Sequence, residues 1–226
     1  MFIQDKKKKR KNLDSVLFIA QSIIDKSEVS DDFIQPIYSY IKAIGSTVQQ
    51  RLLMQLITGQ EVTQVEELFI DLGRDIKGEN NEYIYAPSSI EDNEKISISL
   101  KDNLVIPVAR NMSRFVDNIT GIGTDCGKSF TFQKLNHRSI LYLPIGVTIV
   151  YNGNHSILTG IIKSEGIIHP TEIVDLAPLF EKVKFDGTYY RDIKSNKIVQ
   201  TVRNFELGAI FEIGRLLAKT HISFLN

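Results

Sequence analysis

Cysteine is almost absent from this chain of 226 residues, and a long apolar run is missing altogether. The single cysteine, Cys126, excludes a disulfide within the chain and any metal centre built from several thiolates of one chain. No apolar segment approaches the roughly 18 residues typical of a membrane-spanning helix. The first residues also lack the apolar centre of a secretion signal. These absences predict a soluble, cytoplasmic protein without a membrane partner.

An excess of charge of one sign is missing as well. The chain has 27 Lys and Arg and 27 Asp and Glu, so its formal net charge is +0. The overall charge therefore does not predict a polyanion-binding protein. The local exception is the run 6–11, which holds five Lys and Arg10. Such a run can contact nucleic acid or acidic lipid, but a solvated N-terminal tail is the commoner outcome and the one we expect.

Helical periodicity dominates the first third of the chain, and the 42% hydrophobic content is ample for a core. Apolar stripes predict four amphipathic helices, over about 13–24, 34–44, 46–57 and 63–72. Gly45 is expected to end the second helix, and Ser46 with Gln49 forms a capping-box pattern that would start the third. Stripes of this kind are usually core and sometimes a partner surface. We expect them to lie in the core.

The remainder of the chain indicates mixed α and β structure. A polar connection over 73–93 includes a short predicted strand at 83–85, and apolar residues then alternate with serines from Ile96 to Leu100. Further strands are predicted at 104–108, 130–132, 140–150, 172–176, 188–193 and 198–202, and helices at 112–119, 157–165 and 205–219. The predicted class is α+β. Its parts are a helical lobe over 1–75, a connection with a first strand over 76–103, and an α/β domain with a C-terminal helix over 104–226.

The strongest site signal is the segment 151–156, Tyr-Asn-Gly-Asn-His-Ser, between a predicted strand and a predicted helix. Gly153 allows the backbone to approach a ligand closely, and the free N–H groups of a first helical turn favour an anion. His155 adds a titratable donor. Asn154 and Ser156 can instead cap the helix, which is the plain structural use of such a turn. The sequence therefore predicts an anion site at this turn and leaves its structural use open.

Arginines from other segments supply candidate counter-charges. Arg110 follows the strand predicted at 104–108, Arg114 lies one helical turn later, and Arg138 follows His137. Two guanidinium groups can hold a phosphate or carboxylate in bidentate fashion. The alternative for each residue taken singly, and the commoner one, is pairing with an acid such as Asp117 or covering a sheet edge.

The sequence gives weaker signals for three other kinds of site: a phosphate loop, a cysteine nucleophile and a metal site. The glycine-rich segment 121–129 ends in Gly-Lys-Ser but has Ile122 where a phosphate loop needs glycine, and it follows a predicted helix. Cys126 lacks a local context that would lower its pKa, so we expect a plain thiol and no pairing with His137 or His155 as a nucleophile and base. The four histidines lack ligand spacing, so we predict no metal site.

The segment 147–160 resembles the signature of the ParB/sulfiredoxin-like superfamily, in which a strand leads to a Gly-X-His/Gln-Arg turn that opens a helix. Residues 104–111 resemble that superfamily's first strand and its Pro-to-Arg box, and 112–123 the helix after it. The resemblance covers about 104–176. It implies phosphate binding, with Gly153, Asn154 and His155 at the matching positions. Ser156 stands where the family has Arg, a charge-assisted contact worth about 1.5–3 kcal/mol.

The resemblance implies further expectations. Arg110, Arg114, Arg138 or Lys128 would supply the missing charge beside the phosphate, and His155 would be the catalytic residue of any NTPase or nuclease activity. A cysteine directly before the histidine is absent, so sulfiredoxin chemistry is not expected. The cofactor would be a nucleoside triphosphate with Mg²⁺, in a bacterial or phage-defence protein linked to DNA or nucleotides.

A second hypothesis from a different class remains open. Here the protein is a non-catalytic regulator or adaptor whose N-terminal helices bind a protein partner, and the turn at 151–156 is purely structural.

Overall fold

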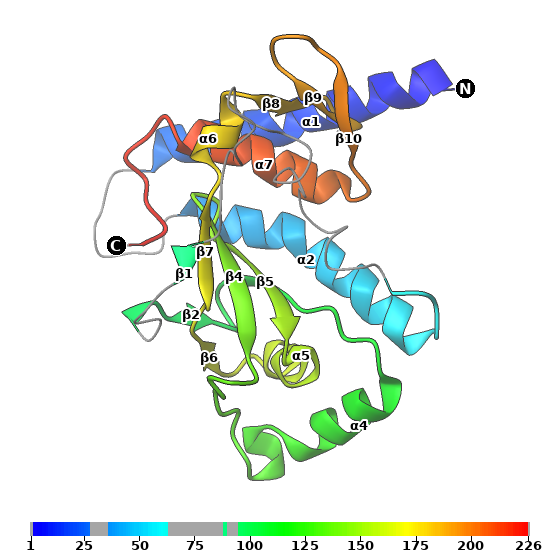
Figure 1. The fold of residues 1–226 in the computed structure, drawn as a ribbon, viewed down its shortest axis with the longest axis vertical. Helices are drawn as coiled ribbons and strands as arrows, with labels where there is room; N and C mark the ends of the chain where they lie inside the picture. The colour runs from blue at the N-terminus through cyan, green and yellow to red at the C-terminus, as the bar shows by residue number, and fades with distance from the viewer. Residues whose placement is uncertain (1, 28–35, 63–87, 90–94, 226) are drawn as a thin grey trace.

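The computed structural model describes residues 2–27, 36–62, 88–89 and 95–225. The fold is of the α+β class, as the sequence predicts, with helices at both ends and mixed sheets between them (Figure 1). The helices are α1 (Phe2–Lys26), α2 (Pro36–Ile57), α4 (Met112–Gly121), α5 (Asn154–Ile162), α6 (Ala177–Phe180) and α7 (Phe205–Leu217). The strands are β1 (Ser88–Ser89), β2 (Ile98–Ser99), β3 (Leu104–Ile106), β4 (Arg138–Leu143), β5 (Val147–Asn152), β6 (Ile167–Ile168), β7 (Glu172–Asp175), β8 (Val183–Phe185), β9 (Tyr189–Asp192) and β10 (Ile198–Thr201).

The central sheet has the strand order β1-β7-β4-β5-β3. β4 and β5 form an antiparallel hairpin, whereas β3 is parallel to β5 and β7 is parallel to β4. The sequence predicts one strand over 140–150, but the turn around Gly146, at a φ of 64°, divides that stretch into β4 and β5. The strands β3 and β5 therefore point the same way, and the segments that follow them emerge at one edge of the sheet.

The largest apolar core joins the N-terminal helices to this sheet. Buried residues of α1, α2 and α7 form one cluster with residues of β3, β5 and β7, among them Leu13, Ile41, Ile106, Ile149 and Phe211. Figure 1 shows α2 crossing the molecule between the α1–α7 pair and the sheet. The expectation that the N-terminal stripes are core is confirmed for α1 and α2. The helix predicted at 63–72, the strand at 83–85 and most of the connection at 73–93 lie outside the described residues.

Gly45 does not end a helix, contrary to the sequence prediction. The helix α2 runs through it without a break, and Ser46 Oγ donates to Lys42 O one turn back instead of capping a new helix. Gly45 is buried, and a Cβ atom there would lie 2.1 Å from Leu104 Cδ2. The missing side chain thus lets α2 approach β3 closely.

We expect Gly45→Ala to lower the free energy of unfolding by about 1 kcal/mol. Overpacking against Leu104 costs roughly 1–3 kcal/mol, and the better helix propensity of Ala returns about 1 kcal/mol. Urea unfolding measures the difference. The matched control is Gly121→Ala, where no atom lies within 4 Å of the new Cβ and stability should not fall.

A second sheet, β10-β9-β8, packs on α7. The buried Glu212 of α7 accepts from Phe185 N at 2.7 Å and pairs with Arg215 at 2.8 Å, and the Arg215 guanidinium also donates to Phe180 O and Val183 O. The charges of Glu212 and Arg215 are thus paired with each other and hydrogen-bonded to backbone groups. This pair fixes the sheet β10-β9-β8 on α7.

The basic run 6–11 is not a solvated tail. It forms part of α1, and the turn at Gly187, between β8 and β9, packs against its backbone at Lys9 and Arg10. Other predicted elements differ as well. Residues 130–132 form no strand, whereas β8 and α6 were not predicted. Within the described ranges, no helix combines the length and the apolar character that a membrane crossing requires.

Candidate functional site

The turn between β5 and α5 begins the candidate site. Gly153 has a φ of 77° and a ψ of 21°, in the left-handed region that favours glycine. A Cβ atom there would lie 2.5 Å from His137 Cδ2 and 3.0 Å from Asn136 O, so the position is closed to side chains. The helix α5 starts directly afterwards, and no side chain caps its N-terminus. The first N–H groups of a helix have no acceptor within it, so this end favours an anion.

Two side chains of the turn hold the segment that follows β3. Asn154 Oδ1 accepts from Val108 N at 2.7 Å, and His155 Nε2 accepts from Asn111 N at 3.1 Å. Asn111 Oδ1 in turn accepts from Arg114 N at 2.9 Å and caps α4. The two anchored amides, Val108 N and Asn111 N, belong to one stretch of four residues directly before α4. The start of α4 is therefore held beside the start of α5.

These contacts enclose a cleft of about 460 Å³. Its lining comes from the β5–α5 turn, the segment after β3, α4 and one loop, and consists of Val108, Arg110, Arg114, Asn118, Asn136, Tyr151, Asn152, Gly153, Asn154, His155 and Ser156. Six of the seven predicted site residues are in this set, and no lining residue is an Asp or Glu. Among the described residues, neither guanidinium of the lining forms an ion pair, so the pairing with Asp117 is not observed. The cleft is therefore polar and cationic.

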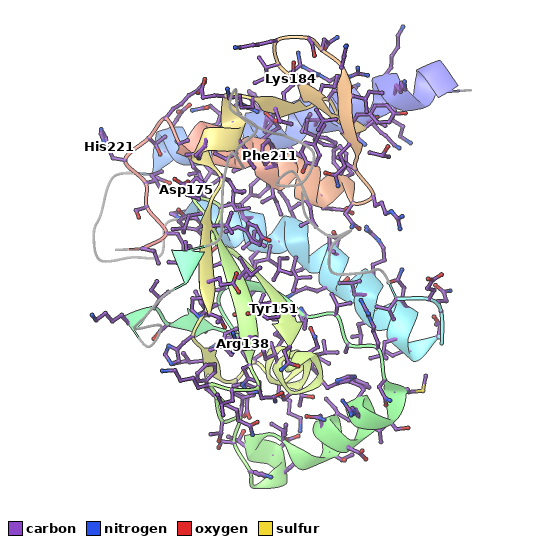
Figure 2. The ribbon with its side chains drawn as sticks, viewed as in Figure 1. Arg138, Tyr151, Asp175, Lys184, Phe211 and His221 are labelled. Atoms are coloured by element: carbon purple, nitrogen blue, oxygen red, sulfur yellow. The ribbon has the colours of Figure 1, made fainter. Side chains whose placement is uncertain are left out.

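Arg138 is the predicted residue that does not line the cleft. Its Nε donates to Tyr151 Oη at 3.3 Å, and that hydroxyl donates to Glu172 Oε1 at 3.0 Å. Figure 2 shows Arg138 and Tyr151 near α5, where β4 begins and β5 ends. Arg138 thus positions the tyrosine at the rim of the cleft.

His155 is a neutral donor in this arrangement. Its Nε2 accepts the Asn111 amide, which assigns the ring hydrogen to Nδ1. Burial lowers the pKa of His155, and the nearby Arg114 charge lowers it further. An imidazole whose Nε2 is already occupied by an amide cannot take up a proton there. The geometry favours ligand binding over general-base catalysis by that atom.

Ser156 is engaged inside the protein. Its hydroxyl lies 2.8 Å from His137 Nε2 and donates to Gly153 O at 3.1 Å. His137 Nδ1 accepts from Gln133 N at 3.0 Å, so Nε2 carries the hydrogen and donates to Ser156. The buried imidazole also stacks on Phe130, with ring centroids 5.2 Å apart. Ser156 therefore supports the turn, and the arginines of the cleft must supply the charge.

The His137 contacts predict a pH dependence of stability. Burial lowers the pKa of His137 below the ordinary 6.5, and that of His155 is lowered as well. The unfolded chain then binds more protons than the folded protein just below pH 6.5, so stability is complete above that pH and falls as the pH decreases through it. Unfolding midpoints measured from about pH 8 to about pH 5 test this.

The variant His137→Gln separates the two histidines, because glutamine does not titrate. Its stability should fall less steeply with decreasing pH than that of the parent protein. An unchanged slope would contradict the assignment of His137 as a buried neutral imidazole.

Five lining residues were not among the predicted site residues: Val108, Asn118, Asn136, Tyr151 and Asn152. The residue Asn118 lies one helical turn after Arg114, and Tyr151 and Asn152 directly precede the glycine, so spacing alone would have found them. Asn136 comes from the loop directly before β4, and no local signal indicates it.

The glycine-rich segment 121–129 binds an internal carboxylate. The carboxylate oxygens of Glu165 accept from Thr124 N at 3.0 Å and Phe130 N at 2.9 Å, and these contacts hold the pKa of that carboxyl below its usual range. Cys126 is exposed, and Lys163 Nζ lies 3.2 Å from its Sγ and 2.7 Å from Asp125 Oδ1. The segment is a connection held by Glu165 and Lys163, and this agrees with the expectation that it is no phosphate loop.

No set of three or more His, Cys, Asp or Glu side chains within the described part of the chain is placed to hold a metal ion. The fold and the cleft thus define an α+β protein with a cationic pocket at a helix N-terminus. Its residues 1–224 match the model of a family of unknown function (DUF6710), and the chain belongs to that family. Comparisons with curated proteins and with solved structures found no match. The ParB/sulfiredoxin resemblance stays a prediction.

Proposed function

We propose that this protein binds the phosphate groups of a nucleotide in the cleft between α4 and α5. The observation that carries the proposal is the joint lining of one cleft by Arg110, Arg114, His155 and the uncapped start of α5, without a carboxylate among the lining residues. An apolar or cationic ligand would leave two guanidinium groups uncompensated, whereas a phosphate satisfies them.

Each group has a role in this proposal. The amides at the start of α5 donate to phosphate oxygens, as backbone amides do at other helix N-termini. Arg110 and Arg114, from the segment after β3 and from α4, line the same cleft and replace the guanidinium that the resemblance places at Ser156. His155 donates through Nδ1. A Mg²⁺ ion would enter bound to the phosphates, since no lining carboxylate is available to hold it.

The size of the cleft supports a nucleotide over a single phosphate ion. Its volume of about 460 Å³ lies in the range of small-molecule sites. Tyr151 and three asparagines extend the polar lining beyond the turn, and amides of this kind recognise the edges of bases. The family's signature has a strand and a helix followed by a strand, the turn and a second helix. This chain has β3 and α4, then the additional strand β4, then β5, the turn and α5, and this order supports the resemblance apart from β4.

A thermal shift assay tests the proposal. Nucleoside triphosphate at a hundred times its Kd should raise the melting temperature by roughly 5–10 °C, because it adds about 2.7 kcal/mol of stability to a chain of this length. The free nucleoside should not. His155→Ala should remove most of the shift, while His221→Ala, at an exposed position near the chain end, should leave it unchanged. A wild-type protein that no nucleotide stabilises, even at low salt, would contradict the proposal.

Binding of a protein partner by the N-terminal helices is the alternative. It is favoured by Phe18 and Ile19 of α1, which are 74% and 46% exposed and line a hollow of about 430 Å³. Apolar side chains this exposed often mark contact surfaces. Sedimentation of the wild type against Phe18→Ser/Ile19→Ser tests self-association through this surface, and identical sedimentation as monomers would contradict that form of the alternative.

A further inference from the structure

A second cationic surface lies on the opposite side of the molecule from α4 and α5. It is formed by the start of α1, over 6–11, and the three-stranded sheet β8–β10, which lie together in Figure 1. We call it the basic end. Lys6 Nζ lies 5.1 Å from the centroid of the Tyr189 ring, and Arg191 Cζ lies 5.6 Å from the same centroid. The Tyr189 ring therefore contacts one cation from each of the two elements.

The sheet β8–β10 and the residues beside it add positive charge to that of the start of α1. Between 181 and 203 the chain has six basic and three acidic residues, although the whole chain is neutral. Two of those acids are engaged internally. Asp186 pairs with Arg191, and Asp192 accepts from Ser195 N at 2.6 Å in the β9–β10 turn. Positive charge therefore exceeds negative charge at the basic end, and the compensating acidic residues lie elsewhere in the chain.

The packing of α1 also fixes these cations in place. The turn at Gly187 contacts the α1 backbone at Lys9 and Arg10, with only 3.1 Å between an ideal Cβ and the backbone atoms. Lysines 7, 8 and 11 stay exposed on this anchored helix. A helix held by a sheet presents its charges at a fixed spacing, whereas a mobile tail does not.

An acidic lipid surface and a nucleic acid are the two polyanions to compare, and the distribution of charge on α1 distinguishes between them. A helix that lies in a lipid interface needs an apolar face opposite its basic face. Six consecutive basic residues cover every direction around a helix, because 3.6 residues complete a turn, so 6–11 has no apolar face. A phosphate backbone requires only positive charge at short intervals. We infer that the basic end binds the sugar-phosphate backbone of nucleic acid, independently of the cleft.

Fluorescence anisotropy with a short mixed-sequence DNA duplex, over a series of salt concentrations, tests this inference. The wild type should bind with an affinity that falls steeply with salt. Lys7→Gln/Lys8→Gln/Lys11→Gln should weaken binding at least about tenfold and reduce the slope of log K against log salt by about 2–3. Gln has nearly the helix propensity of Lys, so α1 should persist.

The matched control removes the same charge elsewhere. Lys26→Gln/Lys101→Gln/Lys219→Gln changes three other exposed lysines and should leave binding within about twofold, as a change of net charge alone acts weakly at distance.

A second variant, Lys194→Gln/Lys197→Gln, alters the β9–β10 turn and not α1, and should also weaken binding. Arg110→Gln/Arg114→Gln should retain duplex binding, which separates this inference from the cleft proposal. Absence of duplex binding, equal losses in both lysine triples, or binding to phosphatidylserine vesicles without duplex binding would overturn it.

Discussion

Replacing both Arg110 and Arg114 by Gln should weaken nucleotide binding by roughly a hundredfold or more. Each charge-assisted contact to a phosphate contributes about 1.5–3 kcal/mol, and each 1.4 kcal/mol is a factor of ten in Kd. We take the lower end of that range for each arginine, because both side chains are exposed. Two such contacts still amount to about 3 kcal/mol. Isothermal titration calorimetry with a nucleoside triphosphate measures the change.

The single variants and one control separate the contribution of each arginine from an effect of net charge. Arg110→Gln and Arg114→Gln should each lose about tenfold, since Ser156 is bound to His137 and cannot compensate. Arg203→Gln, an exposed arginine outside the cleft lining, should leave the affinity unchanged. Equal losses from Arg203→Gln and Arg114→Gln would mean that only the net charge matters, and the assignment of the cleft would fail.

Gly153→Ala should cost about 2–4 kcal/mol of unfolding free energy. A left-handed conformation costs Ala about 1–2 kcal/mol, and the new Cβ would also lie 2.5 Å from His137 Cδ2 and 3.0 Å from Asn136 O. Backbone oxygen cannot give way as a flexible side chain can, so the turn must shift and overpacking is added to the conformational cost. The same shift would displace the amides at the start of α5.

Gly127→Ala is the matched control, because Gly127 is also left-handed, at a φ of 72°, but has no atom within 4 Å of its ideal Cβ. It should cost only the conformational term of about 1–2 kcal/mol. Denaturant unfolding of both variants tests the difference. Equal losses would show that the contact of Gly153 with the 136–137 segment has no effect on stability.

Local signals in the sequence predicted the parts of the site that depend on near neighbours. The glycine turn, the helix that starts at Asn154 and the helix α4 after the β3 segment are all present. The convergence of Arg110 and Arg114 on the turn follows from a parallel pairing of β3 with β5, which places the ends of both strands at one edge. Apolar patterns located β3 and the stretch 140–150 that contains β5, but they showed neither the division of that stretch into β4 and β5 nor the pairing of β3 with β5.

Features that depend on distant packing could not be predicted. Gly45 has the sequence context of a helix stop, and only its approach to Leu104 explains its place within α2. Ser156 has the context of a cap or a ligand, and only the position of His137 shows that its hydroxyl is engaged. Likewise the run 6–11 has the composition of a solvated tail, but the turn at Gly187 packs against it. In each case the partner lies far away in sequence.

An amide-resolved NMR titration of the protein with a nucleoside triphosphate tests whether the start of α5 receives the phosphates. We expect shifts that saturate together for the amides of Gly153, Asn154, His155 and Ser156, and for the Arg110 and Arg114 side chains. Amides of the basic end should not move in step with them. Saturable binding that leaves the β5–α5 turn unperturbed, or no binding at all, would contradict the claim that this helix start receives the phosphates.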